Sequence, residues 1–256
     1  MTLVQETVAA DKPASPLADD VFLTVFVACY NEEEGIVPTL DVLVAALCEF
    51  SFTWEIIVID DASTDRSVER IRQYMRDYPS LPIFLNVNQR NMGLSNNYVD
   101  AAFLGRGTYY RLVCGDNVEP RETLADVFRN IGKADMVIPI HRECGGRSFA
   151  RRFLSRLYTR IVNLITGHRI RYYNGLAVHL RQNVMRFHSR SSGFNFQADL
   201  ITSLLDRGCS YVEVPVEVHE RTSGTSTALT FRNLLSVGHC LLEMALRRLR
   251  MALYGR

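Results

Sequence analysis

Two stretches decide the fold: EIIVIDDASTD, from Glu55 to Asp65, and YYRLVCGDNVEP, from Tyr109 to Pro120. Each begins as an apolar, β-branched run, which is typical of a strand buried on both faces of a parallel sheet. Each run then ends in carboxylates. Because ligands of open α/β sheets bind beyond the carboxyl ends of the strands, these acidic ends predict a binding site. Carboxylates placed there can hold ribose hydroxyls and a divalent cation with its diphosphate.

Strand and helix patterns alternate on both sides of these stretches. Further strands are predicted at 23–29, 83–88 and 135–140. Residues 63–65 can cap a following helix, and Pro120 can open another. This alternation predicts an α/β fold, a Rossmann-like, doubly wound and mostly parallel sheet with helices on both faces.

The pattern changes after residue 140. A polar, glycine-broken loop is expected at 141–152, an amphipathic helix at 153–167, a strand pair or turn at 170–181, and a helix at 194–208. The expected domains are a disordered tail at 1–20, one domain at 21–228 and an amphipathic, basic C-terminal helix at 229–256.

Composition narrows the class of protein. The 256 residues are 47% hydrophobic, and 29 Lys+Arg against 28 Asp+Glu give a net charge of +1, which does not indicate nucleic-acid binding. Six cysteines without a CxxC pair indicate free thiols in a reducing compartment. The first 20 residues lack the pattern of a signal peptide, and no apolar run reaches the roughly 20 residues needed to span a bilayer. A cytoplasmic location is therefore expected.

Three segments in order, VFVACYNEEEG, DDASTD and CGDN with Glu119-Pro120, resemble motifs of family 2 glycosyltransferases of the GT-A fold. That family writes them P-x-Y-N-E, D-D-G-S-x-D and D-x-D. The later segment PVEVHERTSGTS, Pro215 to Ser226, resembles the P-(x)5-R-x-x-G-x-S stretch of polyprenyl-phosphate sugar synthases, the branch similar to dolichol-phosphate mannose synthase. The resemblance runs from about Leu23 to the C-terminal helix and implies a nucleotide-sugar-dependent hexosyltransferase.

The sequence departs from the family pattern at four positions. Ala28 stands for the usual Pro, Ala62 for Gly and Asn174 for Ser or Thr. Cys114 occupies the first acidic position of D-x-D, so one metal ligand is missing or comes from elsewhere. Because Mg²⁺ prefers oxygen ligands, Cys114 is interpreted as a core thiol.

The resemblance assigns the donor site at the acidic strand ends. The residues implied to bind the nucleotide-sugar are Tyr30, Glu32, Asp60, Asp61 and Asp116. Asp61 is expected to accept hydrogen bonds from the base or ribose. The competing interpretation is that Asp60 and Asp61 only cap the next helix.

Asp116 is the predicted metal ligand, for Mg²⁺ or Mn²⁺. One carboxylate suffices where substrate phosphates and water complete the shell, and Asn117 or Glu119 could also contribute. The competing interpretation is an ordinary turn aspartate in Gly-Asp-Asn.

The acceptor side depends on basic residues. Arg221 matches the arginine of R-x-x-G-x-S and is implied to stabilise the departing diphosphate or grip a lipid phosphate. The predicted acceptor-phosphate residues are Arg151, Arg152, Arg156 and Ser226, although the arginines could equally form a solvated face. Asp199 is a candidate base, or an exposed helix carboxylate.

The leading hypothesis is an inverting, metal-dependent glycosyltransferase that moves a sugar from a nucleotide-diphosphate sugar to a polyprenyl phosphate. One alternative is a family 2 enzyme that glycosylates a soluble or glycan hydroxyl with Asp199 as base. Another is a non-catalytic nucleotide-sugar binding protein. The basic segments 147–171 and 247–256 predict peripheral attachment to an anionic membrane surface, on its inner face. The sequence leaves a homo-oligomer open.

Overall fold

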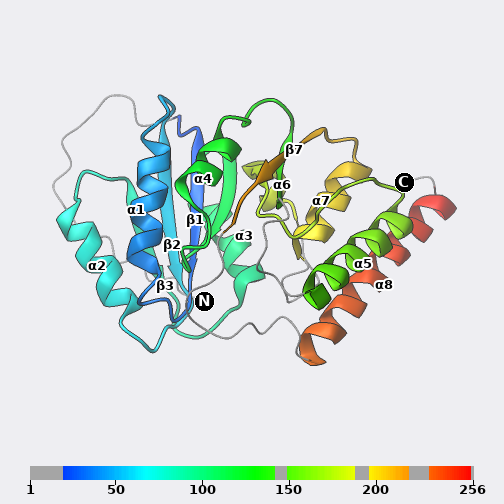
Figure 1. Ribbon diagram of the computed structural model, residues 1–256, viewed down its shortest axis with the longest axis horizontal. Coiled ribbons are helices and arrows are strands. Elements are labelled where there is room, and N and C mark those ends of the chain that lie inside the picture. The colour runs from blue at the N-terminus through cyan, green and yellow to red at the C-terminus, as the bar shows by residue number, and fades with distance from the viewer. Residues whose placement is uncertain (1–19, 142–148, 188–195, 219–230, 255–256) are drawn as a thin grey trace.

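A seven-stranded sheet with helices on both faces forms the centre of the molecule (Figure 1). The computed structural model describes residues 20–141, 149–187, 196–218 and 231–254, with the side chains of 149–152 and 231–234 left undescribed. The strands are β1 (Leu23–Cys29), β2 (Trp54–Asp60), β3 (Ile83–Val87), β4 (Tyr109–Cys114), β5 (Met136–His141), β6 (Val178–Leu180) and β7 (Tyr211–Val216). The helices are α1 (Ile36–Leu47), α2 (Ser67–Asp77), α3 (Leu94–Leu104), α4 (Arg121–Phe128), α5 (Phe149–Thr166), α6 (Arg181–Met185), α7 (Phe196–Asp206) and α8 (Phe231–Tyr254).

The strand order is β3-β2-β1-β4-β6-β5-β7. Neighbouring strands run parallel except at β6, which lies antiparallel between β4 and β5. The predicted doubly wound, mostly parallel sheet is confirmed. From β1 the chain winds outward through β2 to β3 and then crosses back to β4, so the strand order reverses at β1 and β4. Such a reversal opens a crevice at the carboxyl ends of the strands, where ligands of these folds bind.

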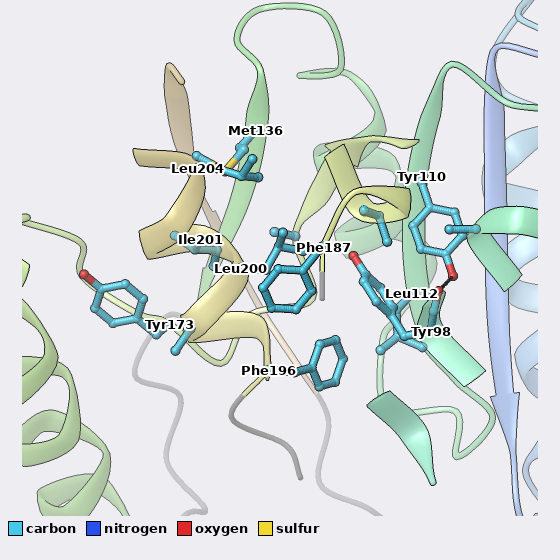
Figure 2. Packing of buried hydrophobic residues seen from close by; sticks show 14 of the residues in the cluster. Tyr98, Tyr110, Leu112, Met136, Tyr173, Phe187, Phe196, Leu200, Ile201 and Leu204 are labelled. Carbon is cyan, nitrogen blue, oxygen red and sulfur yellow. Dashed lines mark hydrogen bonds between the residues drawn. The ribbon is translucent and has the colours of Figure 1, made fainter. Parts of the chain in front are cut away.

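Alternating side chains give the sheet one core on each face. Val25 and Val27 of β1 and Val58 of β2 pack with the apolar sides of α1, α2 and α4. Phe26 and Leu112 face the opposite core, which also receives α3, α5, α7 and α8. Figure 2 shows this second core, in which Tyr98, Tyr110, Phe187, Phe196 and Leu200 lie among residues of the sheet and α7.

Two segments after residue 140 differ from the secondary structure that the sequence predicts. Helix α5 begins at Phe149, so the last four residues of the loop predicted at 141–152 are helical. The segment predicted at 170–181 as a strand pair or turn contains one three-residue strand, β6, and ends at the first residue of α6. The tail predicted at 1–20 lies outside the described residues except for its last residue. In the part of the chain that the structure describes, no helix is both long and apolar enough to cross a bilayer.

Candidate active site

The loop after β1 and the loop after β2 are held together by hydrogen bonds. Side chains of the second loop and of Ser67, the first residue of α2, accept hydrogen bonds from successive backbone amides of the first loop. The bonds run from Asn31 N to Ser63 Oγ at 2.9 Å, from Glu32 N to Ser67 Oγ at 2.9 Å and from Glu33 N to Asp65 Oδ2 at 3.0 Å. In return, the Thr64 amide donates to Asn31 Oδ1 at 2.8 Å. Tyr30 stands half exposed beside this junction, and Glu32 is half buried. The two loops are therefore held in a fixed arrangement at this edge of the sheet.

Asp60 is the last residue of β2 and is fully buried. Its Oδ1 accepts a hydrogen bond from the Ser63 amide at 2.9 Å. This bond lies in the loop before α2, which begins at Ser67 without a side-chain cap, so Asp60 does not cap that helix. Its Oδ2 is buried and accepts no hydrogen bond among the described residues. A buried acceptor without a donor is costly, so this oxygen suits a hydroxyl, an N–H group or a cation brought by a ligand.

The thiol beside Asp60 belongs to the core. Burial, followed by the charge of Asp60, raises the pKa of Cys29 to about 12. Cys29 therefore remains protonated at neutral pH and acts as a small apolar side chain rather than a nucleophile or a metal ligand.

Asp61 accepts hydrogen bonds from the loop between β3 and α3. Its carboxylate accepts hydrogen bonds from Asn88 Nδ2 at 2.9 Å, Met92 N at 2.7 Å and Gly93 N at 2.9 Å. Gly93 has a φ of 83°, a conformation that favours glycine. Asp61 thus holds the loop between β3 and α3 close to the end of β2, while its expected contact with the base or ribose stays a prediction.

Asp116 sits in a turn that is anchored to α1. The Gly115 amide donates to the carbonyl of Ala28 at 2.9 Å, and the Asn117 amide donates to Thr39 Oγ1 at 2.9 Å. Asn117 has a φ of 52°, which completes the sharp turn. At Gly35, a Cβ would lie 2.6 Å from the Gly115 carbonyl oxygen, so only glycine lets the turn approach this closely. Sequence reasoning did not identify Gly35 or Thr39 as supports of Asp116.

Glu119, considered as an additional metal ligand, is paired with an arginine. Arg111 of β4 is fully buried, and its Nη2 donates to Glu119 Oε1 at 2.5 Å. Burial raises the pKa of Glu119 and outweighs the opposing effect of Arg111. The pair ties the loop after Asp116 to the sheet. The signal in the sequence was a single cation inside the apolar run YYRLVC.

The carboxylates at this edge of the sheet suit a divalent cation that binds together with a diphosphate. Asp60 pairs with Cys29 across the sheet, and Gly115 follows directly on the other side of β1. The two acidic loops therefore flank the end of a single strand, about 10 Å apart by strand spacing. Within the described ranges no cluster of three or more His, Cys, Asp or Glu could hold a metal alone. Mg²⁺ is commonly held by one or two carboxylates together with phosphates and water, which is what Asp116 and this edge offer.

Asp199, the predicted base, lies in the first turn of α7 and is bound by the C-terminal helix. Arg247 of α8 donates to Asp199 Oδ1 at 2.5 Å, to Asp206 Oδ2 at 3.2 Å and to Thr202 Oγ1 at 2.6 Å. Arg248 and His168 also contact Asp206, at 3.3 and 2.8 Å. Asp199 is therefore part of an interhelical ion-pair network, which the sequence did not predict.

Comparison with known proteins identifies the family. The sequence model of Glycosyl transferase family 2 matches residues 24–199. The chain belongs to this family. The dolichyl-phosphate beta-glucosyltransferase of Dictyostelium discoideum is 30% identical over 138 residues, covering 51% of this chain and 41% of that protein. The undecaprenyl-phosphate 4-deoxy-4-formamido-L-arabinose transferase of Edwardsiella ictaluri is 26% identical over 209 residues, covering 80% of this chain and 62% of that protein. The chain thus spans less than two thirds of either relative.

Solved structures confirm the GT-A fold of this family 2 glycosyltransferase. Glucosyl-3-phosphoglycerate synthase of Mycobacterium tuberculosis, solved with Mn²⁺, UDP and phosphoglyceric acid, superposes with a TM-score of 0.67 at 14% identity. The match covers 88% of this chain and 78% of that one. The names of the two relatives above also agree with the predicted resemblance to polyprenyl-phosphate sugar synthases.

The structure brings the predicted donor residues of this glycosyltransferase to one edge, but it does not describe the whole acceptor side. Tyr30, Glu32, Asp60, Asp61 and Asp116 all lie at the carboxyl ends of β1, β2 and β4. Arg156 lies on α5 and is exposed. Arg221 and Ser226, with the side chains of Arg151 and Arg152, lie outside the described residues.

Proposed function

We propose that this family 2 glycosyltransferase is an inverting enzyme that moves a hexosyl group from a nucleotide-diphosphate sugar to a polyprenyl phosphate. The observation that carries the proposal is the pair of acidic loops flanking β1 at the point where the strand order reverses. The names of relatives in Dictyostelium discoideum and Edwardsiella ictaluri, both transferases to a polyprenyl phosphate, support the acceptor class.

The donor would lie across the carboxyl ends of β1, β2 and β4. Asp60 Oδ2, buried and lacking a donor among the described residues, would accept from the nucleoside, and Tyr30 and Glu32 would line the same side. Asp116 would face the diphosphate from its anchored turn. A bound Mg²⁺ or Mn²⁺ would supply positive charge to the leaving diphosphate. Solved neighbours of the same fold include complexes with either ion and UDP.

The chemistry favours an anionic acceptor. A phosphate oxygen forms the new bond to the anomeric carbon while the bond to the diphosphate breaks, and its electron pair leaves with the nucleoside diphosphate. Attack from the opposite face inverts the anomeric centre. Because the attacking phosphate is already ionised, no base must remove a proton. A hydroxyl acceptor would need a base, and Arg247 occupies Oδ1 of Asp199, the candidate for that role.

The acceptor phosphate would be held by basic residues. Arg156, exposed on α5, belongs to this proposed group, together with Arg151, Arg152, Arg221 and Ser226. Guanidinium groups bind phosphate through paired hydrogen bonds, and they stabilise charge on a departing diphosphate. With such an acceptor, the protein would bind peripherally to an anionic membrane surface, on its inner face.

A transfer assay tests the function. The purified chain is incubated with a panel of radiolabelled nucleotide-diphosphate sugars and a polyprenyl phosphate in detergent, with Mg²⁺, Mn²⁺ or EDTA. The expected product is a lipid-linked sugar with inverted configuration, formed with either metal and absent with EDTA. Transfer to a soluble glycan without response to any polyprenyl phosphate would reject the acceptor class. Tight donor binding without turnover would indicate a non-catalytic binding protein.

A further inference from the structure

Helix α8 exposes a narrow stripe of leucines. Leu235, Leu242, Leu246, Leu249 and Leu253 are between 39% and 66% exposed. At about 100° per residue, all five project within roughly 60° of one another. Cys240 and Met244 of the same helix are buried in the core and project from the opposite side. The stripe is therefore the outer face of a helix whose inner face is already packed.

Helix α5 packs against α8 (Figure 1). Its exposed side chains are also largely apolar. Phe153, Leu154, Leu157 and Leu164 are exposed, whereas Val162 and Thr166 are buried. Nine large apolar side chains on two adjacent helices exceed the scattered apolar residues of an ordinary soluble surface. Such a concentration marks an interaction site.

The charges of the two helices indicate which kind of partner this apolar face would bind. Helix α5 carries four arginines and no acid, and α8 carries four arginines and one acid, Glu243. Arg160 and Arg250 are exposed on these helices. A second copy of the chain bound symmetrically through this face would place cationic helices against each other, which is unfavourable. An anionic bilayer complements both the apolar stripe and the positive charge.

Two of the basic residues near the end of α8 form ion pairs inside the protein and do not face the proposed partner. Arg247 and Arg248 project inward to the acids of α7 at distances of 2.5 to 3.3 Å. They are therefore not the residues through which this end of the helix would attract lipid. The remaining basic residues then give an incomplete explanation of membrane attachment, and the leucine stripe can supply an apolar contribution.

We infer that the outer faces of α5 and α8 form a membrane-insertion surface, in which the leucine stripe enters the headgroup and acyl boundary of an anionic bilayer. The inference rests on the proposed function, because it specifies how a peripheral enzyme reaches a lipid acceptor. It adds that binding has an apolar component that persists when salt screens the charges.

Vesicle binding of a double variant tests this surface. Leu242→Ser with Leu249→Ser removes two side chains from the middle of the stripe. With vesicles of phosphatidylcholine and phosphatidylglycerol, the wild type should retain binding at on the order of 1 M salt, where the Debye length is about 3 Å. The double variant should bind at least about 10-fold more weakly at every salt concentration, since each leucine loses the favourable transfer of its side chain. The control is Phe103→Ser, on α3, where the removed side chain is equally exposed and binding should not change.

Parallel measurements separate the outcomes. Thermal unfolding midpoints of both variants should stay close to the wild type, because the changed side chains point away from the core. Vesicle binding of the double variant equal to that of the wild type overturns the inference. A wild-type dimer that becomes monomeric in the double variant, with unchanged vesicle binding, also overturns it and assigns the face to a second copy. If no sugar transfer is found but insertion still depends on the leucines, the proposed function fails and the surface stands.

Discussion

Gly35→Ala tests whether the Asp116 turn must lie as close to α1 as the structure places it. Gly35 precedes α1 with φ −91° and ψ −30°, a conformation open to alanine, so the substitution strains no dihedral angle. The new Cβ would lie 2.6 Å from the carbonyl oxygen of Gly115 and 3.0 Å from Cα of Asp116. Both neighbours are backbone atoms and cannot rotate away.

The expected magnitude follows from that overlap. Relief of a contact this short requires the turn to shift by several tenths of an ångström, and overpacking of this kind costs about 1–3 kcal/mol. A displacement approaching 1 Å at a catalytic group can lower the rate about 100-fold. We therefore expect kcat/KM for sugar transfer to fall about 10- to 100-fold, with a loss of stability of at most about 3 kcal/mol.

The assay compares steady-state transfer and thermal unfolding of Gly35→Ala with those of Gly238→Ala. A Cβ added at Gly238, in α8, would meet no atom of another element within 4 Å. The same substitution there should therefore leave transfer unchanged and stabilise the helix by about 0.5–1 kcal/mol. Full activity in Gly35→Ala would refute the idea that this close approach positions Asp116.

Particular side chains give three further predictions. Cys114→Ser should change transfer only modestly if the thiol is a core side chain and not a metal ligand, as the sequence predicts, whereas Cys114→Asp should tighten Mn²⁺ binding. A large loss of metal affinity in the serine variant would show that sulfur coordinates. Burial lowers the pKa of His179 to about 4, so between about pH 6.5 and pH 4 the unfolded chain binds more protons than the folded one. The free energy of unfolding should therefore fall as pH falls through that window, by up to about 3 kcal/mol in denaturant titrations, and His179→Phe should flatten the profile. Arg247→Ala should destabilise the protein by about 2–4 kcal/mol, because it removes an ion-pair partner of the nearly buried Asp206. The control Arg250→Ala removes an exposed side chain and should change stability by less than about 0.5 kcal/mol. Equal effects of the two substitutions would show that the network does not join α7 to α8.

The sequence predicted the parts of the fold that local pattern encodes. The apolar runs at 23–29 and 54–60 became β1 and β2 because β-branched, doubly buried strands have few alternative structures. Strand β6 was not predicted as a single strand, since three residues carry little periodicity and its position depends on pairing with β4 and β5. The first turn of α5 was assigned to a loop because glycines precede it.

The candidate site divides in the same way. Asp60 and Asp116 were predicted from strand ends, because the carboxyl edge of a parallel sheet is a property of the pattern itself. The contact of Asp199 with Arg247 joins residues 48 apart in sequence, and that of Gly35 with Gly115 depends on how a helix packs on a turn. Neither contact leaves a local signal. The engagement of Asp61 by the loop after β3 is likewise tertiary.

Asp116 is proposed to bind a metal ion and a nucleoside diphosphate at the acidic edge of the sheet. Isothermal titration of UDP and GDP, with and without Mn²⁺, into the wild type and into Asp116→Ala tests it most directly, with unfolding midpoints confirming that the variant is folded. We predict that at least one nucleotide binds the wild type in a metal-dependent manner and that the metal-dependent part is lost in Asp116→Ala. Equal affinity with and without metal, or unchanged metal-dependent binding in the variant, would show that Asp116 does not hold the metal.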